Sequence, residues 1–387
     1  MRFHNRMRFT RRTFFQTAGF SGLALAAKPA QNYLVYFGTY TRRNSKGIYV
    51  SRLDAAKGEL TPPELAGECS NPSFVAIHPN GRNLYAVSEL SGQGGQPAGA
   101  VTSFSIDRQS GRLTELNKVS SKGNGPCHLN VDKTGRALVV ANYGSGSVAA
   151  MPVRPDGSLG EAASFIEHKG SSVNPKRQQG PHAHSVNISF DNRFVVAADL
   201  GLDQVLVYRF DPARASLAPN DPAFTKVQPG AGPRHFTFHP NGRFAYVINE
   251  IHSTVTAFTY DRRRGAFSEL HTVSTLPADF KGDNSTAEVV AHPSGKFLYG
   301  SNRGHNSITV FRIDATGKLA LTENVSTGGR VPRNFAIDPT GQWLLAANQE
   351  TDNVAVFAID KTSGRLKATG QTLKVDTPVC VRYVSLG

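Results

Sequence analysis

The chain has 387 residues and an excess of basic side chains, with 43 Lys and Arg against 29 Asp and Glu and a formal net charge of +14. Six of the basic residues and no acidic residue lie in residues 1–28, so the rest of the chain carries +8 (14 minus 6). Those remaining charges are scattered and do not form a basic patch with interleaved aromatic residues, which argues against a nucleic-acid partner and favours anionic small molecules. The three cysteines cannot all be paired within one monomer, and we expect them to be small core residues: Cys69, Cys127 and Cys380.

The beginning of the chain resembles a twin-arginine export signal. The pair Arg11 and Arg12 precedes two phenylalanines, and the weakly apolar stretch over residues 18–27 carries the small-residue pattern that a signal peptidase needs. This apolar stretch is too short to span a membrane. We therefore expect residues 1–30 to be a signal peptide read by the twin-arginine translocase, and residues 31–387 to act in the periplasm or outside the cell, with no membrane partner. The alternative is a basic tail without an export role.

A turn motif recurs along the rest of the chain with a period of about 50 residues. Its clearest copies are His78-Pro-Asn-Gly and His239-Pro-Asn-Gly, and variants begin at His292, Asp338, Asp132 and Ser189. A second signature, an alternating apolar strand that closes on an acidic turn, occurs seven times, at Asp54, Asp107, Asp156, Asp211, Asp261, Asp314 and Asp360. A period of this size is typical of a four-stranded propeller blade. The repeat therefore predicts an all-β, seven-bladed β-propeller and disfavours a β-sandwich.

One period shows how the strands of a blade are recognised. Short apolar or alternating runs cover 73–77, 83–87, 101–106 and 113–119, and clusters of Gly, Pro, Asn and Asp separate them. This pattern indicates antiparallel strands joined by tight turns. Outside the leader no long stretch has a helical apolar period, so we expect little helix.

The two ends of the repeat predict how the ring closes. The first copy begins directly at Tyr33 and lacks an opening strand, whereas residues 377–384 resemble the opening strands at 71–77 and 331–337. We expect the C-terminal strand to be the innermost strand of the first blade. This closure removes a sheet edge that would otherwise favour aggregation.

Polar residues recur near the start of the opening strands, which should line the central channel. One aligned column holds Ser73, Cys127, His184, Arg234, Ala287, Arg333 and Val379. The next holds Phe74, His128, Ser185, His235, Glu288, Asn334 and Cys380. A third, at the end of the second strand, holds Tyr40, Glu89, Tyr143, Leu200, Glu250, Arg303 and Gln349. A purely structural column would be small or apolar throughout, so the histidines, arginines and carboxylates indicate a site at one rim of the channel.

The motifs Gly180-Pro-His-Ala-His-Ser185 and Gly232-Pro-Arg-His-Phe236, followed by Asn249-Glu250 and Val331-Pro-Arg-Asn334, resemble the lactonase β-propeller family over nearly the whole chain from Tyr33 to Val384. That family includes 6-phosphogluconolactonases and fungal carboxymuconate-lactonizing enzymes. The resemblance implies hydrolysis of a sugar lactone in carbohydrate metabolism. It implies a catalytic His, Arg and Glu, which match His182 or His184, Arg234 and Glu250, and a further arginine at Arg303 or Arg333. The export signal departs from the family, whose phosphorylated sugar substrate is cytoplasmic, and leaves open a substrate without phosphate.

The residue types suit ester hydrolysis on chemical grounds as well. A lactone is a cyclic ester, and His182 or His184 can take a proton from water near neutral pH. Arg234 can stabilise the oxyanion, and Glu250 can orient the histidine or bind sugar hydroxyls. The remaining rim residues are expected to bind the substrate: His128, His235, Glu288, Arg303, Arg333 and Asn334.

Several alternatives stand beside this interpretation. The histidines of the His-Pro turns and the turn aspartates are expected to be structural. His182 and His184 could bind a metal together with His128 or His235, but no nearby carboxylate completes a set, so we expect neither metal nor cofactor. No Gly-x-Ser-x-Gly elbow or nucleotide-binding loop is present in the sequence. The competing functions are a lactone-forming cycloisomerase and a non-catalytic binding scaffold. We expect a monomer whose partner is a small lactone.

Overall fold

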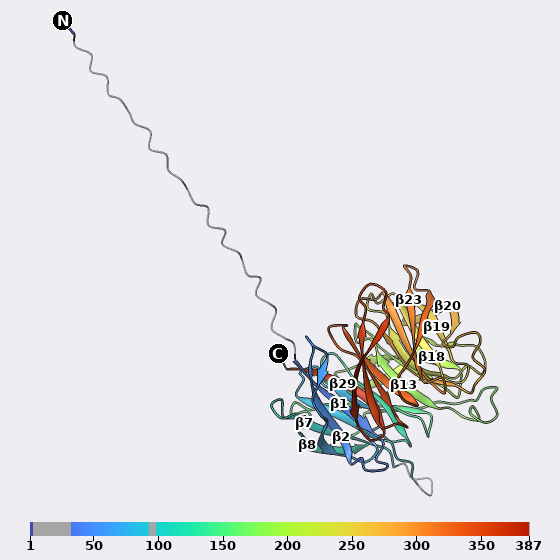
Figure 1. Ribbon diagram of the computed structural model, residues 1–387. Coiled ribbons are helices and arrows are strands. Elements are labelled where there is room, and N and C mark those ends of the chain that lie inside the picture. Colours follow the sequence, from blue (N-terminus) through green and yellow to red (C-terminus); the bar gives the residue numbers. More distant parts are fainter. Residues whose placement is uncertain (3–31, 93–97, 387) are drawn as a thin grey trace. The chain divides into compact units, whose positions relative to one another are not determined.

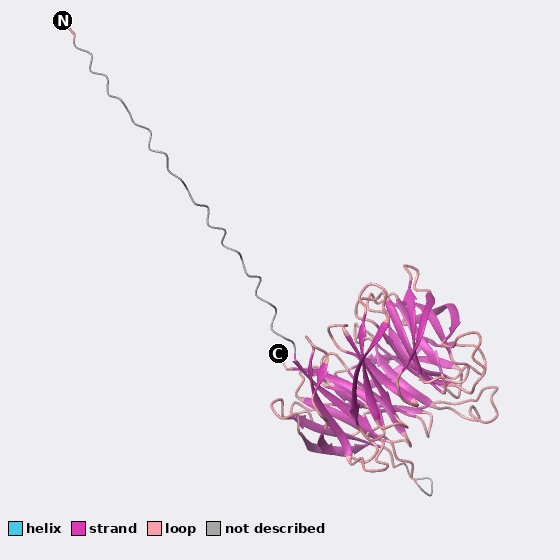
Figure 2. Ribbon diagram, in the orientation of Figure 1, coloured by secondary structure: helices cyan, strands magenta, loops and turns pink. Residues whose placement is uncertain are grey.

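The computed structural model describes residues 1–2, 32–92 and 98–386, and the regular secondary structure in this part of the chain is entirely β-strand (Figure 2). The expected low helix content is therefore confirmed for these residues. No helix long and apolar enough to cross a membrane is found among them. The expected signal peptide, apart from its first two residues, lies outside the described residues.

The strands form seven sheets, and each sheet is one blade. The first sheet combines the two ends of the chain: β29 (Pro378–Ser385), β1 (Asn32–Thr39), β2 (Gly47–Asp54), β3 (Glu59–Leu60) and β4 (Glu64–Glu68). The second and third sheets are β5 (Val75–Ile77), β6 (Asn83–Ser88), β7 (Ala100–Ile106), β8 (Leu113–Ser120), and β9 (Pro126–Val131), β10 (Ala137–Asn142), β11 (Ser147–Pro152), β12 (Ser164–Glu167). The fourth and fifth are β13 (Ala183–Ile188), β14 (Phe194–Asp199), β15 (Gln204–Asp211), β16 (Ser216–Lys226), and β17 (Pro233–Phe238), β18 (Phe244–Asn249), β19 (Thr254–Asp261), β20 (Ala266–Ser274). The sixth and seventh are β21 (Ser285–Ala291), β22 (Phe297–Arg303), β23 (Ser307–Ile313), β24 (Leu319–Ser326), and β25 (Pro332–Ile337), β26 (Trp343–Asn348), β27 (Asn353–Ile359), β28 (Leu366–Lys374).

The predicted ring closure is confirmed. The C-terminal strand β29 pairs antiparallel with β1, in the register Tyr33 to Ser385 and Phe37 to Val381 (Figure 1). The strand β29 also contacts the innermost strands of both neighbouring blades, β25 and β5. The seven innermost strands therefore contact one another in a closed ring, and the C-terminal strand gives the first blade the inner strand that β1 would otherwise lack.

Repeated side chains join each blade to the next one. Buried tyrosines on the second strand of four blades donate hydrogen bonds to the carbonyl oxygens of turn glycines in the following blade, at 2.7–3.1 Å: Tyr36 to Gly111, Tyr85 to Gly157, Tyr246 to Gly317 and Tyr299 to Gly364. The His-Pro turns act in the same way, because the Nε2 atoms of His78, His239 and His292 lie 2.7–2.9 Å from turn carbonyls of the next blade. The structural role expected for these histidines agrees with these contacts.

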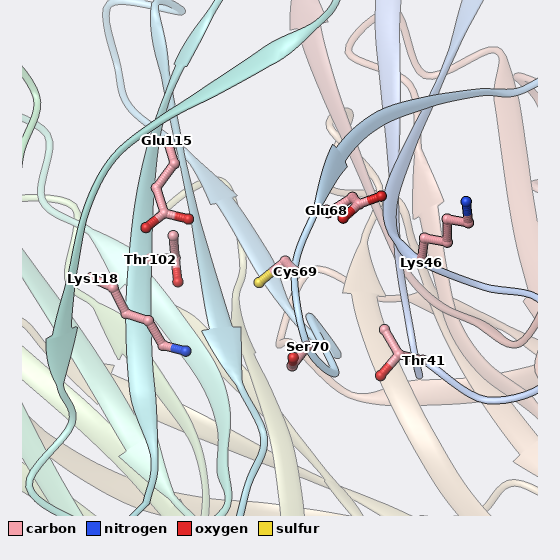
Figure 3. A pocket seen from close by; sticks show the side chains of 8 residues that line it. All are labelled: Thr41, Lys46, Glu68, Cys69, Ser70, Thr102, Glu115 and Lys118. Carbon is pink, nitrogen blue, oxygen red and sulfur yellow. The ribbon is translucent and has the colours of Figure 1, made fainter.

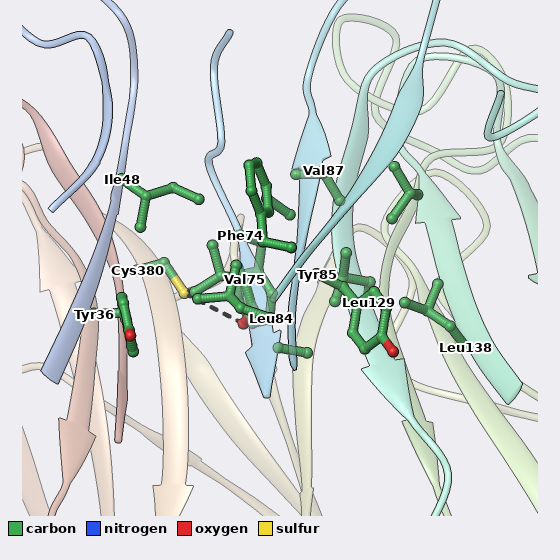
Figure 4. Close-up of a cluster of buried hydrophobic side chains, with 14 of the residues drawn as sticks. Tyr36, Ile48, Phe74, Val75, Leu84, Tyr85, Val87, Leu129, Leu138 and Cys380 are labelled. Atoms are coloured by element: carbon green, nitrogen blue, oxygen red, sulfur yellow. Dashed lines mark hydrogen bonds between the residues drawn. The ribbon is translucent and has the colours of Figure 1, made fainter. Parts of the chain in front are cut away.

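The core lies between neighbouring blades, where both faces of each sheet are covered. Figure 4 shows the cluster between the first three blades, in which Tyr36 and Cys380 of the first blade pack near Val75 and Leu84 of the second. The amide of Val75 donates a hydrogen bond of 3.4 Å to the sulfur of Cys380, so the closing strand also contacts the second blade directly. Cys127 and Cys380 are buried, as expected.

Cys69 differs from the expectation that all three cysteines are core residues. Its side chain is half-buried and lines an open pocket of about 570 Å³ between the first two blades, together with Lys46 and Lys118 (Figure 3). The reason is that Cys69 follows the short outer strand β4 instead of lying on an inner strand. Burial raises the pKa of its thiol, so a reactive role for this cysteine is not supported.

Candidate active site

A β-bulge near the start of the innermost strands turns two successive side chains toward the channel. The register of six of these seven strands skips at this point, and the skipped residue in three of them is His184, Arg234 or Arg333. In a regular strand, neighbouring side chains point to opposite faces, whereas a bulge re-aims them. As a result, both Arg234 and the following His235 have partners in the channel.

Glu250 is the centre of a cluster of arginines at one end of the channel. Its Oε2 atom lies 2.8 Å from Arg234 Nε and 2.8 Å from Arg303 Nη2, and its Oε1 atom lies 2.6 Å from Arg177 Nη2. Arg234 is 2% exposed and also donates from Nη1 to the carbonyl of Ala287 at 2.7 Å. We call Glu250, Arg177, Arg234 and Arg303 the Glu250 cluster.

The cluster determines the charge of Glu250. Burial favours the neutral acid, but Arg303, Arg234 and Arg177 together outweigh it and hold the pKa of Glu250 well below its usual range. The carboxylate is therefore ionised over the physiological pH range and cannot act as a general acid. Three guanidinium groups on one carboxylate leave a local excess of positive charge, which suits a developing oxyanion.

Two histidines near the start of β13 contact the Tyr143 ring, His182 by stacking and His184 edge-on. His182 is partly exposed, stacks on the Tyr143 ring with centroids 4.5 Å apart, and its Nδ1 atom lies 2.9 Å from the Tyr143 carbonyl oxygen. His184 is buried, and its Nε2 atom lies 3.9 Å from Glu250 Oε2. Burial, and then the nearby Arg234, hold the pKa of His184 well below its usual value. His184 is consequently neutral at pH 7 and able to accept a proton.

Arg333 lies at the same end of the channel and forms no direct ion pair with any residue that the structure describes, although Glu89, which lines the same cavity, and Glu250 act on its charge from a greater distance. Its guanidinium lies 5.5 Å from the centre of the Tyr40 ring, and among the described residues it makes no hydrogen bond or ion pair. It lines a small cavity with His184, Arg234, Ser73 and others. The space open to the centre of a water molecule there is about 10 Å³, roughly enough for one water.

Four residues expected to bind substrate at the rim lie in a second layer, further along the channel. His235 Nδ1 lies 2.8 Å from Glu288 Oε1, Asn334 donates to Glu288 Oε2, and the His128 and His235 rings are 5.2 Å apart. Asn334 is 1% exposed and also accepts a hydrogen bond from the Val381 amide. The amide NH2 and the amide oxygen of the Asn334 side chain are thus both hydrogen-bonded within the protein. The reason is that this position of the opening strands faces the interior of the ring. Substrate binding by these four residues stays a prediction.

Two residues of the site, Tyr143 and Arg177, were not predicted from the sequence. Tyr143 was aligned in the third column but was not selected, although its hydroxyl accepts a 3.2 Å hydrogen bond from Arg177. Arg177 belongs to the loop between β12 and β13, which has no counterpart in the repeat, so nothing in the repeat pattern indicated it.

The loop that carries Arg177 is tied to the strand that carries Arg234. The neighbouring Gln178 is fully buried and donates to Asp203 Oδ1 at 2.8 Å. The same oxygen accepts a 2.7 Å hydrogen bond from the amide of Gly232, which adopts a φ of 67° just before β17. Asp203 therefore holds the loop that carries Arg177 and the strand that carries Arg234 in a fixed relative position.

The fold and this cluster define a β-propeller enzyme with a polar site at the channel entry. The comparisons with known proteins agree. Residues 34–383 match the family model described as Lactonase, 7-bladed beta-propeller. A 6-phosphogluconolactonase of Bacillus subtilis is 39% identical, with 91% of this chain and 98% of the relative covered, and a 6-phosphogluconolactonase of Formosa agariphila is 34% identical, with 88% and 97% covered. The solved structure of a periplasmic gluconolactonase of Pseudomonas aeruginosa is 39% identical with a TM-score of 0.86, and covers 92% of this chain and 100% of that one.

The chain belongs to the seven-bladed β-propeller lactonase family. It is accordingly a lactonase, a hydrolase of cyclic esters, and the scaffold alternative is not supported.

Proposed function

We propose that the protein hydrolyses a sugar lactone of the gluconolactone type, in carbohydrate metabolism outside the cytoplasm, after twin-arginine export. The observation that carries this proposal is the Glu250 cluster beside the neutral His184. The relatives named 6-phosphogluconolactonase and periplasmic gluconolactonase support the substrate class.

The proposed roles follow from the geometry. His184 is the general base, because it is neutral and lines the water-sized cavity together with Arg234 and Arg333. Arg234 stabilises the oxyanion that forms when water, giving its proton to His184, adds to the lactone carbonyl. Collapse of this intermediate breaks the ring C–O bond, and His184 returns the proton to the leaving ring oxygen. Glu250 holds Arg234 and faces His184, and the partly exposed His182 binds sugar hydroxyls.

The first test is pH-stat hydrolysis by the leaderless protein, corrected for spontaneous ring opening. We expect turnover of glucono-δ-lactone above the spontaneous rate, and we compare it with 6-phosphoglucono-δ-lactone. Absence of turnover with both lactones would contradict the proposed substrate class.

Arg333 is expected to bind any anionic substituent, because its guanidinium has no direct ion-pair partner among the described residues. Replacing Arg333 by Gln should lower kcat/KM for the phosphorylated lactone at least tenfold, roughly the value of a charged hydrogen bond, and should change the neutral lactone much less. Arg330→Gln, on the exposed loop just before it, is the matched control. Equal losses for both lactones would remove this role from Arg333.

The oxyanion role of Arg234 has its own test. Arg234→Gln should lower kcat about 10²- to 10³-fold, the usual cost of removing an oxyanion donor. Arg365→Gln, which disrupts an exposed ion pair with Glu323, is a control for loss of an arginine elsewhere. Thermal unfolding of both variants separates catalysis from stability, and activity within twofold of the unmodified enzyme would refute the assignment.

A further inference from the structure

The end of the channel opposite the Glu250 cluster holds a second cavity. Its volume is about 440 Å³, within the range of small-molecule sites, and all seven innermost strands line it. The lining includes Val131, four residues beyond the bulge residue Cys127 on β9. At about 3.3 Å per residue, this places that part of the cavity roughly 13 Å further along the channel.

A layer of rings separates this cavity from the small cavity beside His184. The Phe74 and His128 rings are 4.0 Å apart, and the His235 ring lies 5.8 Å from Phe74 and 5.2 Å from His128. Phe74 is the one residue that lines both cavities. A ligand in the second cavity would therefore not enter the small cavity in which the proposed base His184 and Arg234 lie.

The second cavity contains a cation that no carboxylate of the described residues neutralises within ion-pair distance. Arg382 on β29 donates from Nη1 to the Val381 carbonyl at 2.7 Å, and its guanidinium lies 4.4 Å from the centre of the Phe74 ring. The nearby Glu288 is already engaged, with one oxygen near His235 and the other accepting from Asn334. Most of the donors of Arg382 are thus available to a ligand.

An unused amide donor lines the same space. The Nδ2 atom of Asn187 on β13 is buried and has no hydrogen-bond partner among the described residues. The rest of the lining combines apolar side chains, among them Ile77, Val131 and Phe236, with the polar residues His128, Asn130 and Glu288.

We propose that this cavity is a second binding site, for a small monocarboxylate with an apolar body. The carboxylate would pair with the Arg382 guanidinium through charge-assisted hydrogen bonds. The apolar body would contact the side chains of the channel wall. This site is independent of the proposed sugar-lactone function.

The test uses benzoate as the probe and benzamide, its uncharged counterpart, in isothermal titration calorimetry with the folded protein. We expect benzoate to bind at least tenfold more tightly than benzamide. Arg382→Gln should weaken benzoate binding at least tenfold and leave lactone hydrolysis within twofold, whereas Arg333→Gln should leave benzoate binding unchanged.

Equal binding of benzoate and benzamide, or no benzoate binding, would overturn the proposal, and this comparison needs no variant. Loss of benzoate binding in Arg333→Gln would also overturn it, because the probe would then occupy the lactonase site. Thermal unfolding of Arg382→Gln checks that the variant is folded.

Discussion

Replacing His184 by Asn is expected to lower kcat about 10²- to 10⁴-fold, the usual contribution of a general base. The neutral ring of His184 is buried against the Glu250 cluster and lines the water-sized cavity. Asparagine keeps much of the volume and the hydrogen bonding but cannot take the proton. The matched control is His182→Asn, two residues earlier on the same segment, which should change KM more than kcat.

The pH dependence provides an independent measure of the same role. A base must be deprotonated to act, and burial together with Arg234 lowers the pKa of His184. The rate should therefore stay constant as the pH falls through the ordinary histidine range near 6.5 and decline only below it. The pH–rate profile of His184→Asn should lack this decline at low pH. A decline centred at or above pH 6.5, or a larger kcat loss in His182→Asn than in His184→Asn, would refute the assignment of the base to His184.

Truncation after Val375 is expected to give an insoluble or molten product. The deletion removes β29, whose five buried residues include four apolar side chains of the core: Val379, Cys380, Val381 and Val384. At roughly 1.5–3 kcal/mol for each buried apolar side chain, the loss is about 6–12 kcal/mol, which is comparable to the whole stability of a typical domain. It also exposes the edge of β1 to pairing with other molecules.

Solubility, near-UV circular dichroism and thermal melting measure this effect. Truncation after Ser385, which leaves β29 complete, is the control and should melt cooperatively like the full chain. A soluble and cooperatively melting product of the longer deletion would show that the ring does not depend on closure by the C-terminal strand.

The sequence by itself determined the blades and their closure. Strand alternation and turn chemistry are local properties, so the His-Pro turns and the period of the chain were enough to predict seven sheets. The similarity of residues 377–384 to other opening strands was enough to predict the closing strand, because each blade repeats the same side-chain pattern. The same alignment selected Arg234, Glu250 and His184 as candidates.

Only the tertiary structure decided how these candidates are arranged. The bulges turn successive residues such as Arg234 and His235 toward the channel, and strand alternation alone does not reveal this. Arg177 reaches Glu250 from a loop outside the repeat, so its contact depends on how that loop folds back over the ring. Ion pairing likewise depends on three-dimensional distance. Arg303 pairs with Glu250, whereas Arg333 has no direct ion pair among the described residues, and Glu288 lies in a separate layer with His235.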